Sequence, residues 1–142
     1  MILDANVLLY AVDADSPHQQ VAADWLTSAL NGSTRVGLPC QTVGAFLRIA
    51  THPRVSRNPL PARDAHAFVD SWLAAPAAWV PPAGEGALAA YRLLATRHHV
   101  TGNLVPDALL AALALENGVP VVSADSDFAR FPEVVWLNPL RS

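Results

Sequence analysis

The chain opens with MILDANVLLY (residues 1–10), a short apolar run that ends in an acid and is followed by a second apolar segment. Met1-Ile2-Leu3 has the character of a short strand. The residues after Asp4, from Ala5 to Tyr10, can turn directly into a helix. The opening therefore predicts a strand, an acid at its carboxyl end and a helix, in that order.

Three more aspartates stand at the tips of later predicted elements. Asp107 follows Pro106, a residue favoured at the first position of a helix, and leads an Ala/Leu-rich segment. Asp125 and Asp127 follow residues 119–123, the best candidate for a buried strand. Because the carboxyl ends of parallel strands lie along one edge of an open sheet, we expect these acids to meet Asp4 there. Four clustered acids indicate a metal site.

The remaining segments alternate between helix and strand patterns. A cap and a proline at Ser16-Pro17 predict a helix that ends at Asn31-Gly32. The other predicted helices are 41–51, 62–75, 85–98 and the segment after Asp107, and the other predicted strands are 35–38, 78–80 at an edge, and 134–137. Strands that alternate with helices predict an α/β fold with a central parallel sheet and right-handed crossovers.

Length and composition predict one domain over residues 1–142, because a chain of this length buries about 70% of its unfolded surface. Hydrophobic residues make up 52% of the chain, yet no apolar run approaches the roughly 18 residues of a membrane span. With no secretory pattern at its start, we expect a cytoplasmic protein. The single cysteine, Cys40, excludes an internal disulfide and a cysteine-rich zinc cluster.

The charge is distributed unevenly along the chain, although its net value is only −3. No acid lies between Asp24 and Asp64, whereas this stretch contains five arginines, Arg35, Arg48, Arg54, Arg57 and Arg63. Every fixed cation is an arginine, the side chain best matched to phosphate. The pattern suits a polyanion such as RNA, for which Arg48, Arg54 and Arg57 are the candidate contacts. A solvated arginine face explains the charges equally well.

Three blocks of the sequence resemble the PIN-domain ribonucleases, and in particular the VapC-type toxins of bacterial toxin–antitoxin pairs. The blocks are Ile2 to Tyr10, Asn103-Leu104-Val105-Pro106-Asp107-Ala108 and Ser123-Ala124-Asp125-Ser126-Asp127-Phe128. They occur in the family's order and spacing over nearly the whole chain. The resemblance implies a PIN-like three-layer fold, RNA hydrolysis, a homodimer and a small VapB-type antitoxin whose tail lies near the acids.

Phosphodiester hydrolysis needs an activated water and stabilisation of the charge that develops on phosphate, which divalent cations held by carboxylates supply. Oxygen ligands without a Cys/His cluster favour Mg²⁺ or Mn²⁺. We assign Asp4 and Asp107 as the main metal ligands, with Asp125 and Asp127 completing the catalytic pocket, Asp125 as a further ligand. Asn6 and Ser123 are expected to orient ligands or waters around the metal.

The sequence departs from the family at one position. PIN nucleases usually carry a glutamate shortly before the segment that matches Phe46-Leu47-Arg48, but here Gly44 and Ala45 occupy that neighbourhood. Gln41 is the nearest polar substitute. The missing acid leaves open a rival function, an RNA- or antitoxin-binding protein with weak or no nuclease activity.

Each acid also has a structural interpretation. Asp4 could cap the helix that follows it, Asp107 could favour a helix N-terminus, and Asp125 and Asp127 could form turns. The helices that carry Val43, Phe46, Phe68 and Trp72 are candidate contact surfaces for the partners, although core packing explains these side chains equally well.

Overall fold

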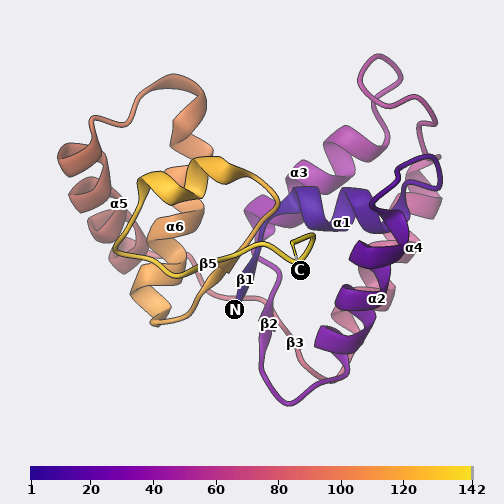
Figure 1. Cartoon of the computed structure of the whole chain (residues 1–142), viewed down its shortest axis with the longest axis horizontal. Helices are drawn as coiled ribbons and strands as arrows, with labels where there is room; N and C mark the ends of the chain where they lie inside the picture. The colour runs from indigo at the N-terminus through magenta and orange to yellow at the C-terminus, as the bar shows by residue number, and fades with distance from the viewer. Residues whose placement is uncertain (142) are drawn as a thin grey trace.

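A sheet of five parallel strands forms the middle of the molecule, in the order β3-β2-β1-β4-β5 (Figure 1). The computed structural model describes residues 1–141. The strands are β1 (Ile2–Leu3), β2 (Val36–Gly37), β3 (Ala78–Trp79), β4 (Val121–Val122) and β5 (Trp136–Leu137). β1 is central, with Ile2 opposite Gly37 on one side and Val121 on the other. The prediction of one domain over 1–142 stays a prediction, and Ser142 lies outside the described residues.

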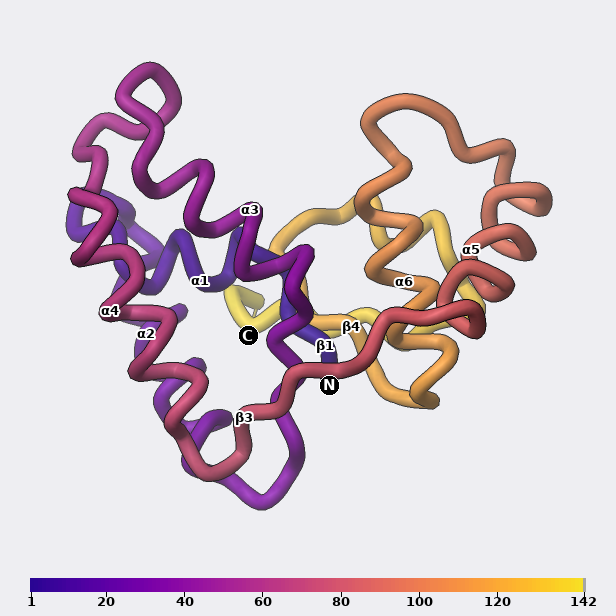
Figure 2. The backbone as a smooth tube through the Cα atoms, turned by 180° about the vertical axis from the view of Figure 1, so that it is seen from behind, coloured from indigo at the N-terminus to yellow at the C-terminus, as the bar shows by residue number. Residues whose placement is uncertain are grey.

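Helices cover both faces of this sheet. They are α1 (Ala5–Val12), α2 (Gln19–Leu30), α3 (Cys40–Ala50), α4 (Ala62–Leu73), α5 (Glu85–His98) and α6 (Val105–Asn117), with short 3₁₀ helices η1 (Gly102–Leu104) and η2 (Ser126–Arg130). Figure 1 shows α1 to α4 on one side of the strands and α5, α6 and η2 on the other, and the view from behind in Figure 2 agrees. The predicted α/β fold, with three layers around a parallel sheet, is confirmed.

Alternation along the strands sends neighbouring side chains to opposite layers. Leu3 and Val122 pack into the core beneath α1 to α4, whereas Ile2 and Val121 pack into the core beneath α5 and α6. All four side chains are fully buried. Because successive residues of a strand face opposite sides, two-residue strands are enough to connect both cores.

The first of these cores contains two of the side chains that were candidate contact surfaces. Phe46 of α3 is fully buried and lies edge-on to Trp72 of α4, with ring centroids 4.9 Å apart. Phe68 also stacks on Trp72 but remains 39% exposed. Core packing therefore accounts for Phe46 and Trp72, and only Phe68 presents a large part of its surface to solvent.

One predicted helix start is wrong by two residues. The segment after Ser16-Pro17 becomes helical only at Gln19, with His18 as the cap residue. The Ser16 hydroxyl accepts a hydrogen bond from the His18 backbone N–H at 3.1 Å, so it closes a turn before the helix instead of capping the helix itself. The other predicted elements occur with small shifts at their ends. No helix in residues 1–141 is both long and apolar enough to cross a membrane.

Candidate metal centre

The four predicted aspartates lie at the carboxyl edge of the sheet, as the parallel topology requires. Asp4 follows β1 directly and caps α1, and Asp125 lies three residues beyond β4 and caps η2. Asp127 belongs to η2, and Asp107 is the third residue of α6. Segments more than 100 residues apart in the sequence thus contribute acids to one place.

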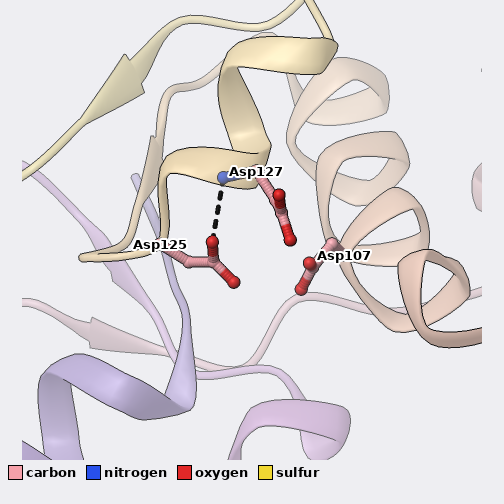
Figure 3. Close-up of side chains that lie close together, drawn as sticks. All are labelled: Asp107, Asp125 and Asp127. Atoms are coloured by element: carbon pink, nitrogen blue, oxygen red, sulfur yellow. Dashed lines mark hydrogen bonds between the residues drawn. The ribbon is translucent and has the colours of Figure 1, made fainter.

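Three of the carboxylates converge closely. Asp107, Asp125 and Asp127 each offer one oxygen, and these oxygens all lie within 4.8 Å of one another (Figure 3). The Asp125 carboxylate is held in position because it accepts a hydrogen bond from the Asp127 backbone N–H at 2.8 Å. All three side chains are half-buried, so they remain accessible to an ion from solvent.

Asp4 is held beside this group by a network of hydrogen bonds. Its Oδ1 accepts from the Ala5 backbone N–H at 2.7 Å, and its Oδ2 accepts from the Ser123 hydroxyl at 2.8 Å and the Asn6 amide at 3.2 Å. The Ser123 oxygen accepts in turn from the Asn6 amide and the Asp125 backbone N–H. Asn6 also accepts from the Ala124 backbone N–H. Asn6 and Ser123 therefore connect Asp4 to the segment that carries Asp125.

The crowding of acids changes their protonation. Burial, and to a smaller extent the negative charges of Asp4, Asp125 and Asp127, together raise the pKa of Asp107 to about 7. Burial also raises the pKa of Asp4, although the hydrogen bonds from Ser123 and Ala5 oppose this change. The site thus carries more negative charge than its surroundings neutralise, and this excess is what a bound cation would relieve.

The donor set suits a hard divalent cation. Carboxylate oxygens are the ligands preferred by Mg²⁺ and Mn²⁺, and neither cysteine nor histidine belongs to the group of converging side chains. The oxygens of three aspartates lie close enough to share one ion. The structure thus fits the predicted metal, while the choice between Mg²⁺ and Mn²⁺ stays a prediction.

Comparison with known proteins agrees with the fold. Residues 1–134 match the PIN domain family. The chain belongs to this family. It is similar to Ribonuclease VapC37 of Mycobacterium tuberculosis, with 46% identity over 97% of this chain and 96% of the relative. Ribonuclease VapC33 of the same organism is 40% identical over 99% of both chains. The predicted resemblance to VapC-type proteins is thereby confirmed.

Solved structures share the architecture of this PIN domain. FitAcB from Neisseria gonorrhoeae superposes with a TM-score of 0.72 at 21% identity, covering 99% of both chains. VapBC2 from Rickettsia felis, bound to a DNA fragment from their promoter, superposes with a TM-score of 0.70 at 17% identity, covering 96% of both chains. At these identities the agreement concerns the fold.

The neighbourhood in which the family glutamate is absent has room for a larger side chain. Gly44 is exposed on α3, and a Cβ added there would meet no atom within 4 Å. Gln41, the suggested substitute, lies beside the acids, because its amide donates a hydrogen bond to the Pro106 carbonyl at 2.8 Å. This bond ties the start of α3 to the start of the PIN domain's α6, next to Asp107. Metal ligation by Gln41 stays a prediction.

The predicted RNA-contacting arginines lie on the arm of the PIN domain formed by α3 and the loop that follows it. Arg48, Arg54 and Arg57 are all exposed. Arg57 lines a cleft together with Val12 and Asp13 at the end of α1, whereas Asp4 lies at its start. An eight-residue helix is roughly 12 Å long, so this arginine is about that far along α1 from the acids. Arg57 therefore lies away from the acid cluster, and RNA binding by the three arginines stays a prediction.

Sequence reasoning missed two side chains that fix the strand ends. The buried Thr42 hydroxyl donates to the Leu3 carbonyl at 2.6 Å, directly before Asp4. The Trp136 indole N–H donates to the Ser123 carbonyl at 2.9 Å. Both contacts join segments that are not neighbours in sequence, so no local pattern could have revealed them.

Proposed function

We propose that this PIN domain is a metal-dependent endoribonuclease that hydrolyses RNA phosphodiester bonds and acts as the toxin of a toxin–antitoxin pair. The observation that carries the proposal is the convergence of three aspartate oxygens within 4.8 Å, at the carboxyl edge of the sheet. The relatives at 40–46% identity over nearly the whole chain are named ribonucleases, which supports the same reaction.

The aspartates would hold Mg²⁺ or Mn²⁺. Asp107 and Asp125 are the ligands best supported by both the sequence and the geometry, with Asp127 close enough to join them and Asp4 near enough for its charge to act on Asp107. When bound, such an ion supplies an activated water and stabilises the charge that develops on the phosphate. Asp107 must be deprotonated to bind it. With a pKa of about 7, Asp107 is poised to exchange its proton for a cation near neutral pH.

Ser123 and Asn6 position the carboxylates. Ser123 is fully buried and joins the Asp4 carboxylate to the Asp125 backbone, so a shift of one acid is transmitted to the other. Asn6 fixes the same arrangement from the first turn of α1. Neither side chain needs to touch RNA for its loss to disturb the spacing of the aspartates.

The proposed partners are those of a toxin–antitoxin protein. We propose an RNA substrate, a VapB-type antitoxin and a homodimer, in the cytoplasm. The solved structures with this fold are described as VapBC and FitAcB, one of them bound to a promoter DNA fragment, which supports a complex with an antitoxin. An arginine from that partner would neutralise the excess negative charge around Asp107.

The decisive experiment uses purified protein freed of antitoxin. It is incubated with total RNA in Mg²⁺, in Mn²⁺ or in chelator, beside the Asp107→Asn variant. Discrete cuts that need both metal and Asp107 are the expected result. They would also show that the family glutamate is dispensable in this chain.

The second candidate function is binding without cleavage, which the absence of the family glutamate in the neighbourhood of Gly44 supports. A folded protein that cuts no RNA in either metal, yet still binds RNA or antitoxin, would support this alternative. Introducing an acid by Gly44→Glu is the matched test, because the side chain has room. If Gly44→Glu cuts RNA and the original protein does not, the missing glutamate would explain why the original protein is inactive.

A further inference from the structure

A polar hollow of about 340 Å³ opens next to the acid cluster and shares Asp127 with it. Besides Asp127 its walls include His98, His99, Thr101, Asn103 and Arg130. This volume falls within the roughly 300–1,000 Å³ of small-ligand sites. Since Asp127 belongs to both, the hollow adjoins the place where the acids would hold a phosphate.

His99, on the wall of the hollow, has a backbone conformation that is uncommon for a residue with a side chain. It ends α5 in the left-handed region, with φ 53° and ψ 48°. Glycine is the usual residue there, and the equivalent position after α6 is indeed Gly118, with φ 63°. His99 is the only described non-glycine residue with positive φ. Histidine is among the side-chain-bearing residues found more often in this conformation, and here its exposed imidazole lines the hollow.

Arg130 lines the hollow at its boundary with the metal centre. Arg130 Nε lies 3.5 Å from Asp127 Oδ1, and 64% of the Arg130 side chain is exposed. Since a guanidinium has five N–H donors, this contact leaves others free for a ligand. His98 contributes a fixed part of the wall, because its Nε2 lies 2.8 Å from both Glu133 oxygens and its ring packs edge-on against Phe131.

We propose that this hollow binds one unpaired nucleobase of the RNA, next to the scissile phosphate, and contributes to the choice of cleavage site. The inference rests on the proposed ribonuclease function. Imidazole and guanidinium planes stack on bases, and the Thr101 hydroxyl and Asn103 amide supply donors and acceptors for a base edge. A base held in a duplex keeps its edge paired, so the hollow selects single-stranded RNA.

The test measures RNA binding and cleavage separately. Fluorescence anisotropy in chelator follows binding of labelled oligoadenylate, oligocytidylate and oligouridylate to the full protein and to His99→Gly and Arg130→Lys. His99→Gly relieves the backbone strain, so the variant folds at least as well as the original. Arg130→Lys keeps the charge beside Asp127 but removes the planar group. The matched controls, His66→Ala and Arg92→Lys, alter exposed residues that do not line the hollow.

The expected result is a roughly tenfold weaker affinity for the preferred oligonucleotide in each hollow variant, as removal of one stacked base contact predicts. The nucleotides found beside mapped cuts in total RNA should also become less biased. If the original protein cuts RNA but both variants keep its affinity and its cut sites, the proposed base binding in the hollow would be wrong and the ribonuclease function would stand. If the original protein cuts no RNA but the hollow variants bind RNA more weakly than it does, base binding in the hollow would be supported and the nuclease function would be rejected.

Discussion

At the scale of single residues, the raised pKa of Asp107 makes the stability of the folded protein depend on pH. Its carboxyl binds a proton with a pKa of about 7 in the folded protein, against an ordinary value of 3.8. Below pH 4 it is protonated in both the folded and the unfolded chain. Between the two values the folded chain holds the proton and the unfolded chain does not. The stability that the protonated Asp107 contributes to the folded protein is therefore lost as the pH rises through about 7. The metal-free protein should therefore have a higher melting temperature at pH 5 than at pH 8.

The Asp107→Asn variant separates this effect from other titrations. Asparagine has no charge to repel its neighbours, so the variant should be more stable than the original protein at pH 8 in chelator. Adding Mg²⁺ or Mn²⁺ at pH 8 should raise the melting temperature of the original protein and leave the variant nearly unchanged. Thermal unfolding followed by circular dichroism measures both. An equal metal response in the two proteins would place the ion elsewhere.

Ser123 is the residue whose loss should damage the site most without removing an acid. Ser123→Ala removes three hydrogen bonds and leaves the Asp125 backbone N–H without its partner, while Asp4 and Asn6 keep the bond between them, so the free energy of unfolding should fall by roughly 1–3 kcal/mol. Cleavage should fall roughly 10–100-fold. Urea unfolding and a rate measurement check the two numbers. Ser126→Ala, at an exposed position, serves as the control and should change stability by less than about 0.5 kcal/mol.

At the scale of elements, two glycines should respond to alanine in opposite directions. Gly44→Ala in α3 adds a Cβ to open space and removes a flexible residue from a helix, so it should stabilise by roughly 0.5–1 kcal/mol. Gly37→Ala in β2 places its Cβ 2.7 Å from Ile2 Cδ1 and 3.0 Å from the Met1 carbonyl oxygen, so it should destabilise. Denaturant unfolding of both variants tests the pair. Stabilisation at Gly37 would contradict the close packing of β1 against β2.

Element boundaries show where local patterns stop being sufficient. The pattern of Asn117-Gly118 gave the end of α6 correctly, because a left-handed glycine terminates a helix through its own backbone. The Ser16-Pro17 pattern gave the start of α2 two residues early. A serine hydroxyl can bond either to a helix N-terminus or to its own turn, and the choice is decided by the path of the chain around it.

At the scale of the whole molecule, charge is separated between an acidic centre and an arginine-bearing arm. If Arg48, Arg54 and Arg57 each contact a phosphate, replacing all three by glutamine should lower the salt dependence of single-stranded RNA binding by about 2 in the slope of log K against log salt. Replacing Arg35, Arg63 and Arg92 changes the net charge equally and is the matched control. In that protein the slope should stay nearly constant, since Arg35 stacks over Trp79 and Arg63 lies 3.8 Å from Asp64. Equal losses in both would indicate a diffuse attraction.

The sequence by itself determined the α/β class, the order of strands and helices, and the presence of acids at the strand ends of this PIN domain. These features depend on period, caps and strand-terminal residues, which act over a few neighbouring positions. Only the tertiary structure decided that Asp127 converges with Asp107 and Asp125 while hydrogen bonds hold Asp4 beside them. The pKa of Asp107 and the hollow beside His99 were also beyond the sequence. Both depend on distances between segments far apart in the chain, which packing of the two cores sets.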